Sequence, residues 1–331
     1  MNHSFELLMD QAIELINKSD NIYICSHVQP DGDNIGSTLG LYMAISKIKE
    51  RVYVIKSDDI PSDYKFLPNS HVFKEYDTNS DVDLFISLDS SDIERLGPGK
   101  ELLRKAKKVI NIDHHVTNDN FGDINIVLPD ASATGEIVYK FIKRLNVDID
   151  KDIATCLYTG ISTDTGRFMY SNTTYETHLI ISDLLKTGID LNSININLYQ
   201  NRSIERTKLF LEVLYNMEFF LDNKVAVAIV TQQMMEKNNA KLEDTEGIVS
   251  FMRDTGPIEV ACLLKEISEN EVKVSLRSKR YVDVSEIALK FDGGGHVRAA
   301  GCTIYDTMDN VKNIVLDEIL KSFRWFYGWY N

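Results

Sequence analysis

The sequence predicts an α/β protein of two domains, an N-terminal domain built on a parallel sheet with helices on both faces and a smaller C-terminal α/β domain with a mixed sheet. Through the first half, short β-branched runs alternate with helical patterns, which is typical of a parallel sheet wrapped by helices. In the second half, strands follow one another without long helices between them. The chain has 331 residues, 44% of them hydrophobic, and this exceeds what one core usually organises.

The first half supplies the elements of the parallel sheet in chain order. Strands are predicted at 21–26, 51–57, 82–88 and 107–112, and helices at 36–50, 133–145 and 152–162. In the last helix, apolar residues recur at a four-residue stride at Ile153, Leu157 and Ile161, which indicates one buried face. The segment 187–220 then changes composition, with Asn-rich polar residues ahead of a charged helix. We therefore expect a catalytic domain over 1–190, a connection over 191–214 and a second domain over 215–331.

The second half supplies a smaller mixed sheet. Strands are predicted at 223–230, 259–267 and 271–278, followed by a short helix at 284–291. The tail, residues 322–331, is dense in aromatic side chains. Such a tail stacks on nucleic-acid bases in some proteins, but we expect it to pack a terminal helix onto the core or onto a subunit interface.

Composition limits the classes of function. The chain has 36 basic and 50 acidic residues and a formal net charge of -14, which would repel a long polyanion such as a nucleic-acid duplex. A short or small phosphorylated partner fits this balance better. The four cysteines are scattered and form no paired spacing, so neither a disulfide framework nor a zinc ribbon is expected.

We do not expect the N-terminal segment to be a signal peptide. The N-terminal segment places acidic residues in a helical pattern and lacks the basic start and continuous apolar core of a signal peptide. No apolar run approaches the ~20 residues that span a bilayer. We expect a cytoplasmic protein without a membrane partner, and the sequence leaves open whether it forms a homodimer.

The first candidate site lies in the loop after the first predicted strand. A single His or Asp in a loop is usually a turn or cap residue. Here His27, Asp31 and Asp33 fall within seven residues, and Pro30 and Gly32 bend the loop sharply, so all three side chains can face one point. Because such a convergence of like charges is costly without a cation, the loop indicates a metal site.

Three more clusters follow predicted strands or end a helix, at the edge where an open α/β sheet places its ligands. Asp89 ends an apolar strand, where a desolvated carboxylate needs a partner. Asp113, His114 and His115 follow the next strand, and adjacent histidines behind an aspartate suit transition-metal ions. Asp164 closes a helix and faces the negative end of its dipole, a conflict that a cation would remove.

Together these residues predict two divalent metal ions. The candidate ligands are His27, Asp31, Asp33, Asp89, His114 and Asp164. The set has more oxygen than a structural zinc site and more nitrogen than a calcium or magnesium cage, so Mn²⁺ is the best match, with Co²⁺ or Mg²⁺ as substitutes. Six ligands are too many for one catalytic ion with open positions, whereas two ions ~3.5–4 Å apart, bridged by Asp89, account for them. Such a pair activates water for attack on a phosphoryl group.

Seven motifs run in order along the chain: SHVQPDGDNIGS, SLDSSDIERLG, NIDHHVTND, ASATGE and STDTGRF, then VSLRSK and GGGHVRAAG. With them, the chain resembles the DHH phosphoesterase superfamily. It resembles specifically the DHH–DHHA1 proteins that act as oligoribonucleases ("nanoRNases") and as phosphatases of 3′-phosphoadenosine 5′-phosphate (PAP). The resemblance implies an N-terminal DHH domain, a C-terminal DHHA1 domain, and a manganese-dependent hydrolase of short oligonucleotides and small nucleotide phosphates.

The resemblance also implies a role for each matched residue. One ion is held by His27, Asp31 and Asp89, and the other by Asp33, Asp89, His114 and Asp164. The catalytic residues are then Asp89, His115 and Asp113. His115 contacts the scissile phosphate, and Asp113 lies behind the ligands and orients the histidines.

The second domain carries a candidate phosphate site. A glycine run alone usually marks a flexible loop, but glycines also let successive N–H groups turn toward an anion. An arginine at a strand end adds a bidentate phosphate grip, and a serine adds a hydroxyl donor. The predicted substrate-binding residues are Arg277, Ser278, Gly293, Gly294, Gly295 and His296. Relatives often carry a fourth glycine where this chain has Asp292, whose carboxylate would weaken or reshape anion binding.

Two other functions remain open. The enzyme could be a phosphodiesterase of linear dinucleotides such as pApA from cyclic di-AMP turnover, which turnover of pApA against pentanucleotides would distinguish. From another class, the chain could be a nucleotide-sensing module without catalysis. The presence of all six expected ligands argues against the sensing module.

Overall fold

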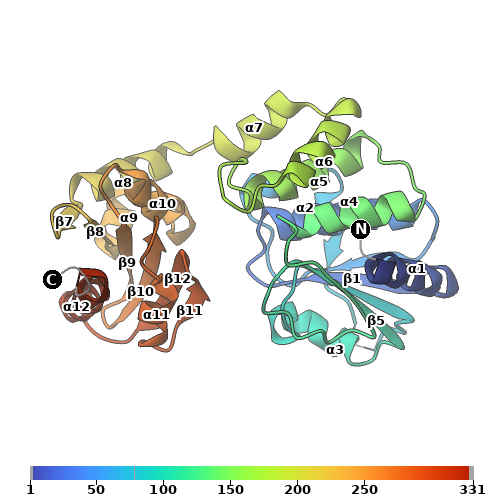
Figure 1. Ribbon diagram of the computed structural model, residues 1–331, viewed down its shortest axis with the longest axis horizontal. Coiled ribbons are helices and arrows are strands. Elements are labelled where there is room, and N and C mark those ends of the chain that lie inside the picture. Colours follow the sequence, from blue (N-terminus) through green and yellow to red (C-terminus); the bar gives the residue numbers. More distant parts are fainter. Residues whose placement is uncertain (1–2, 78, 328–331) are drawn as a thin grey trace. The chain divides into compact units, whose positions relative to one another are not determined.

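The computed structural model describes residues 3–77 and 79–327, and the chain divides into two compact units, Met1–Asn201 and Arg202–Asn331 (Figure 1). The division falls inside the segment 191–214 that the sequence predicts as the connection. Most of that segment is helical, since it contains α7 (Leu191–Tyr199) and the greater part of α8 (Ile204–Tyr215).

The first unit is built on a six-stranded sheet in which every strand is parallel, in the order β3-β2-β1-β4-β5-β6. Its strands are β1 (Ile22–Ser26), β2 (Val52–Ile55), β3 (Phe73–Lys74), β4 (Leu84–Leu88), β5 (Lys108–Asp113) and β6 (Ile124–Val127). The predicted fold class of this half is thereby confirmed. The sequence-based prediction missed β3 and β6, the two edge strands, because they are too short to show a clear run.

Helices cover both faces of this sheet, as predicted. They are α1 (His3–Lys18), α2 (Gly32–Ser46), α3 (Lys100–Leu103), α4 (Thr134–Arg144), α5 (Lys151–Asp164), α6 (Tyr175–Lys186) and α7, with 3₁₀ helices η1 (Ser62–Tyr64), η2 (Ser70–Val72) and η3 (Glu94–Gly99). Because side chains alternate along a strand, Ile22 and Ile24 of β1 join the larger core with α1, α2, α4 and α5. Tyr23 and Cys25 point to the other face, which η3 and α3 cover.

The close crossing of α2 and α5 depends on glycine. A Cβ on Gly36 of α2 would lie 2.4 Å from the carbonyl oxygen of Cys156, and a Cβ on Gly160 of α5 would lie 2.7 Å from Oδ1 of Asp33. The backbone of Cys156 cannot yield as a flexible side chain can, and the carboxylate of Asp33 is held by two backbone amides, so both helices need glycine here. The crossing brings the N-terminal end of α2 beside the C-terminal part of α5, which positions two of the candidate ligands.

The second unit holds a mixed sheet, which confirms the second part of the predicted fold. Its strands, β7 (Glu218–Phe220), β8 (Val225–Val230), β9 (Val260–Ser268), β10 (Glu271–Ser278), β11 (Gly294–His296) and β12 (Ala299–Ile304), follow the order β11-β12-β10-β9-β8-β7. Only β8 and β9 pair in parallel. A parallel pair needs a crossover, which is why α9 (Gln232–Asn238), η4 (Leu242–Thr245) and α10 (Ile248–Asp254) lie between two strands where no long helix was expected.

Each face of this sheet has its own core. On one face, α11 (Val284–Leu289) and α12 (Met308–Tyr327) pack against β9, β10 and β12. On the other, α8 and α10 cover β8 and β9. Phe323 of α12 is buried in the first core, whereas the side chains of residues 324–331, which carry most of the aromatic tail, lie outside the described residues. None of the described helices combines the length and the apolar character needed to cross a membrane.

Candidate metal centre and active site

The candidate site lies at the carboxyl edge of the parallel sheet of the first unit. The strands β1, β4 and β5 are neighbours there, and each is followed by a candidate ligand: His27 after β1, Asp89 after β4 and His114 after β5. Because parallel strands end at the same edge, three segments far apart in the sequence deliver their side chains to one place.

Asp89 is the central residue of this site. Its side chain is almost fully buried, and its backbone takes a φ of 54°, a left-handed conformation that Asp tolerates better than most residues. Its two carboxylate oxygens face different imidazoles: Oδ2 lies 3.4 Å from Nε2 of His27, and Oδ1 lies 3.7 Å from Nε2 of His114. This is the orientation that a carboxylate bridging two ions requires.

The two histidines are oriented by backbone carbonyls. Nδ1 of His27 lies 2.7 Å from the carbonyl oxygen of Val28, and Nδ1 of His114 lies 3.3 Å from that of Ala131. In each ring Nε2 is therefore turned toward the carboxylates. Metal-bound histidines are commonly held in this way, with the second ring nitrogen in a hydrogen bond that fixes the tautomer.

All six predicted ligands come together. Three groups have ligand atoms within 4.8 Å of one another: His27, Asp31 and Asp89; Asp33, His114 and Asp164; and Asp89, His114 and His115. Among residues 3–77 and 79–327, no lysine or arginine forms an ion pair with any of these four aspartates. The alternative reading of the cluster, carboxylates held by basic side chains, does not apply to the described residues.

Asp33 is fixed by the N-terminus of α4. The backbone N–H of Thr134 donates to Oδ2 at 2.6 Å, and that of Gly135 donates to Oδ1 at 2.9 Å. The hydroxyl of Thr134 donates to Oδ1 of Asp89 at 3.0 Å. Orphan amides at a helix N-terminus favour negative charge. The sequence reasoning gave Thr134 no role, although the start of a predicted helix within ASATGE was a signal for it.

Asp113 supports His115 and stands behind the cluster. Its buried Oδ1 accepts from the backbone N–H of His114 at 2.9 Å and lies 2.7 Å from Nδ1 of His115. Its Oδ2 accepts from Nδ2 of Asn118 at 2.6 Å, and the same amide donates to the carbonyl oxygen of Ser90. Asn118 was also missed by the sequence reasoning, because an Asn in a loop resembles an ordinary turn residue.

The electrostatics of the cluster fit divalent cations. Burial, with the charges of Asp89 and Asp164 next, raises the pKa of Asp33 well above its usual range. Burial also raises the pKa of Asp164 to about 7, with Asp89 adding to the shift against the opposing charge of His114. Burial works against the charge on Asp89 as well, but His27 and His114 outweigh it and hold the pKa of Asp89 well below its usual range. Carboxylates crowded in this way gain from a bound cation.

Taken together, the surroundings of His115 favour its charged form. Burial disfavours its charged form, but the hydrogen bond to Asp113 and the charge of Asp89 outweigh burial and raise the pKa of His115 to about 9. The ring is only partly buried. An imidazolium of this kind suits contact with an anionic phosphate.

In the second unit, the structure brings Arg277 and His296 onto one face of the sheet. Both pair with Ala299 of β12, from its two sides, so their Cα atoms lie about 10 Å apart and their side chains point the same way. Ser278 is buried on the opposite face, where its hydroxyl donates to the carbonyl oxygen of Val297. Arg298 donates to the carbonyl oxygen of Val282 at 2.8 Å.

The glycine run is a strand rather than a flexible loop. Residues 294–296 form β11, which pairs with β12. A Cβ on Gly293 would lie 2.3 Å from the carbonyl oxygen of Gly301, and Gly295, with a φ of 140°, would place one 2.5 Å from that of Ala299. Close approach to β12 therefore demands glycine at both positions, and of the three glycines only Gly294 has open space around it.

The fold and the site together define the class of this protein. A parallel sheet that gathers aspartates and histidines at its carboxyl edge, in groups that share Asp89 and His114, is the arrangement of a metal-dependent phosphoesterase.

Comparison with known protein families agrees with this class. The DHH family model, N-terminal domain, matches residues 21–161, and the DHHA1 domain model matches residues 222–324. The chain belongs to the DHH family and carries a DHHA1 domain.

Relatives match along most of the chain. The bifunctional oligoribonuclease and PAP phosphatase NrnA of Thermus thermophilus is 37% identical over 296 residues, covering 86% of this chain and 84% of that protein. A probable protein of the same name from Streptococcus mutans is 31% identical, covering 88% of this chain and 92% of that protein. Among solved structures, an exopolyphosphatase-related protein from Bacteroides fragilis matches with a TM-score of 0.89 and 32% identity, covering 96% of this chain and 95% of that chain.

Proposed function

We propose that this protein is a manganese-dependent phosphoesterase that hydrolyses short oligoribonucleotides from an end and removes the 3′-phosphate of PAP. The observation that carries the proposal is the position of Asp89, whose two oxygens face His27 and His114, one from each of two ligand groups. The names of the relatives in Thermus thermophilus and Streptococcus mutans support the choice of substrates.

The residues divide into two ion sites and a layer behind them. One ion would be held by His27, Asp31 and Asp89, and the other by Asp33, Asp89, His114 and Asp164. The donor set of carboxylate oxygens and imidazole nitrogens fits Mn²⁺. When bound, the ions activate a water molecule and neutralise charge on the phosphoryl group.

His115 would contact the scissile phosphate as an imidazolium. Asp113 holds Nδ1 of this ring and is held in turn by Asn118, so the ring is oriented before substrate arrives, which lowers the cost of reaching the reactive geometry. In the second unit, Arg277 and His296, on one face of the sheet, would hold phosphate. Gly294, whose surroundings are open, lets the strand backbone approach the ligand.

The proposal is tested by hydrolysis of a labelled pentaribonucleotide, pApA and PAP with and without Mn²⁺. Asp89→Ala removes the residue shared by two ligand groups, and we expect turnover of every substrate to fall by roughly a thousandfold or more, because a metal contributes several kcal/mol to the transition state and each 1.36 kcal/mol is tenfold in rate. Arg277→Ala should mainly raise KM, because a phosphate grip away from the reacting atoms contributes to binding in both states.

The test has a clear negative outcome. Full nucleotide affinity without any Mn²⁺-dependent turnover by the wild type would identify a binding module and not an enzyme. Rapid turnover of pApA with negligible turnover of the pentanucleotide would narrow the substrate to dinucleotides.

A further inference from the structure

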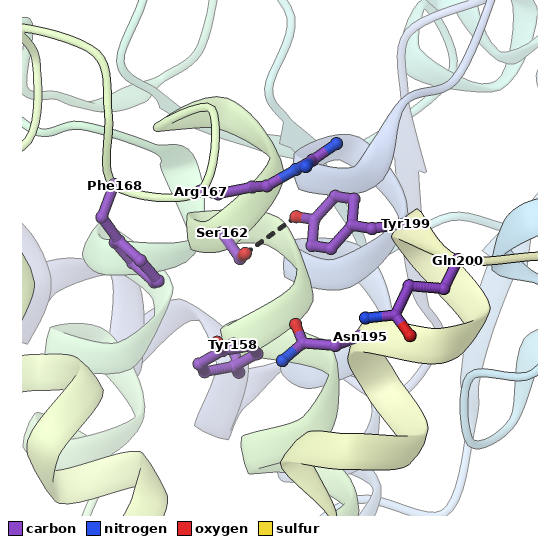
Figure 2. Close-up of a pocket in the computed structure, with 7 residues that line it drawn as sticks. All are labelled: Tyr158, Ser162, Arg167, Phe168, Asn195, Tyr199 and Gln200. Atoms are coloured by element: carbon purple, nitrogen blue, oxygen red, sulfur yellow. Dashed lines mark hydrogen bonds between the residues drawn. The ribbon is translucent and has the colours of Figure 1, made fainter.

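A hollow in the first unit lies beside α5, and none of the candidate metal ligands lines it. It encloses about 350 Å³, which is within the range of small-molecule pockets. Tyr158 and Ser162 line it from α5, and Arg167 and Phe168 line it from the turn after that helix (Figure 2). The end of α7 forms the remaining wall. No role in the reaction has been assigned to any of these side chains.

The centre of this pocket is a stack of Arg167 on Tyr199. The guanidinium carbon lies 4.2 Å from the centre of the tyrosine ring, and Figure 2 shows the two groups one above the other. The hydroxyl of Tyr199 is fixed by a 2.8 Å hydrogen bond to Oγ of Ser162. A guanidinium that stacks through its face keeps its N–H edges available for a ligand in its own plane.

Three polar side chains of the pocket, Arg167, Asn195 and Gln200, make no hydrogen bond or ion pair within the described part of the chain. Arg167, in a chain with 50 acidic residues, has no ion pair or side-chain hydrogen bond among residues 3–77 and 79–327, and the same holds for the side-chain amides of Asn195 and Gln200, which line the pocket from the end of α7. Among the residues that the structure describes, no acidic side chain lines it. The pocket therefore offers one cation, amide donors and acceptors, and aromatic rings to whatever enters.

The backbone that presents Arg167 is strained. Gly166, Arg167 and Phe168 have φ values of 55°, 63° and 64°, a left-handed conformation that Arg and Phe seldom adopt. The turn is held by the backbone N–H of Arg167, which donates to the carbonyl oxygen of Ser162 at 2.8 Å, and by that of Phe168, which donates to Oγ1 of Thr165 at 3.1 Å. Strained residues of this kind cluster at active sites and ligand clamps.

The pocket lies at the same end of α5 as the metal centre. Ser162 and the candidate ligand Asp164 are two residues apart, about 3 Å along the helix axis, and their side chains leave the helix on opposite sides of a cylinder about 10 Å wide. A ligand that spans the end of α5 can therefore occupy both places. A mononucleotide held at the metal centre alone would leave the pocket vacant.

We propose that this pocket binds the base, with the adjoining phosphate, of a nucleotide of the substrate other than the one whose phosphate is hydrolysed. The inference rests on the proposed function, and it identifies single-stranded oligonucleotides as the substrate class that gains from the site. Bases stack on aromatic and guanidinium planes, the amides of Asn195 and Gln200 suit the mixed donors and acceptors of a base edge, and Arg167 suits the phosphodiester. An inorganic anion would contact only Arg167, and an apolar ligand would form no hydrogen bond with Arg167, Asn195 or Gln200.

Two variants test the proposal, Arg167→Ala and the double variant Asn195→Ala with Gln200→Ala. We expect each to raise KM for pApA and for a pentaribonucleotide about tenfold, in keeping with the loss of one stacked base, with kcat unchanged and with KM for PAP unchanged. The matched control is Arg202→Ala, which removes another exposed arginine that stacks on an aromatic ring, Phe210, at 5.5 Å in the second unit. This control should change no constant.

A binding measurement separates this inference from the proposed function. Adenosine 5′-monophosphate is titrated into metal-free protein in EDTA, with the Arg167 side-chain N–H signal followed by NMR. The proposal expects a shift of that signal that survives Arg277→Ala, even if the wild type hydrolyses nothing, in which case only the proposed function fails. No shift of the Arg167 signal, together with unchanged KM for the oligonucleotides, overturns the pocket proposal. An equal rise in KM for PAP also overturns it, since the pocket would then hold the hydrolysed nucleotide.

Discussion

Each of the two units contains a buried carboxylate that accepts hydrogen bonds from backbone amides, but the two carboxylates have different surroundings. In the second unit, Glu259 is nearly fully buried and accepts from the backbone N–H groups of Arg280, Tyr281 and Val282, at 2.7 to 3.2 Å. In the first, Asp33 accepts from two amides at the start of α4, and burial together with nearby carboxylates raises its pKa.

The difference shows what marks a functional carboxylate. The hydrogen bonds of Glu259 go only to backbone amides among the described residues, so they tie the segment after β10 to the start of β9 and satisfy the charge. Asp33 is satisfied by amides to a similar degree, yet it is crowded by groups of its own sign. Burial alone therefore does not identify a site, whereas convergence of several carboxylates with histidines does.

The largest expected effect is on catalysis by a variant of Asp164, which should lose activity without losing stability. Asp164→Asn removes a predicted ligand of the second proposed ion, so we expect kcat for PAP to fall roughly a thousandfold. A metal contributes several kcal/mol to the transition state, and each 1.36 kcal/mol is tenfold in rate. Because the pKa of Asp164 is raised to about 7, its charge at pH 8 opposes folding, and the Tm of the metal-free variant should not fall.

Asp152→Asn, the same change at an exposed position of α5, is the matched control and should leave both kcat and Tm unchanged. A drop of several degrees in the Tm of metal-free Asp164→Asn would show that Asp164 holds the fold together as Glu259 does, and the comparison would break.

At Glu259 we expect the opposite result, a loss of stability without a loss of metal binding. Glu259→Ala leaves three buried backbone N–H groups without their acceptor, so the free energy of unfolding should fall by about 2–4 kcal/mol, as measured by urea denaturation. The affinity for Mn²⁺, measured by calorimetric titration, should not change, because the candidate ligands lie in the first unit.

Glu269→Ala, at an exposed position between β9 and β10, is the control for loss of one acidic side chain. If Glu259→Ala weakened Mn²⁺ binding while Glu269→Ala did not, the ligand set would extend beyond the first unit.

The smallest expected effect is the pH dependence of stabilisation by metal. In metal-free protein the pKa of Asp164 is raised to about 7, so the folded state binds a proton that the unfolded state has already lost, and stability falls as pH rises through 7. A bound cation takes the place of that proton. The gain in Tm on adding Mn²⁺ should therefore be a few degrees larger at pH 8 than at pH 6.

Differential scanning fluorimetry in Mn²⁺ and in EDTA at the two pH values measures this difference. Asp164→Asn should reduce it. An equal gain in Tm at both pH values would mean that Asp164 and its neighbours do not compete with protons for the ion.

Much of the site could be predicted from the sequence because its ligands are chemically specific and follow strands. Asp89 directly follows an apolar run, His27 and His114 each follow one after a single polar residue, and parallel strands must end at one edge. The groups that fix these ligands left no comparable signal. Thr134 acts partly through its backbone N–H, which every residue except proline possesses.

Some features were decided by packing against distant segments. Gly293 and Gly295 resemble a flexible loop in sequence, but both lie in close contact with β12, and Gly295 is part of the strand β11. Ser278 is a chemically suitable phosphate donor, yet strand alternation turns it away from Arg277.

By itself, the sequence predicted the two-domain α/β class, the positions of the main strands along the chain and six candidate ligands, all of them Asp or His, because hydrophobic periodicity and residue chemistry are local properties. Only the tertiary structure decided that the two oxygens of Asp89 face different histidines, that Asn118 holds Asp113, and that Arg167 stacks on Tyr199 beside α5. Those relations join residues distant in the chain, and their geometry is set by how helices and strands pack, which local composition does not encode.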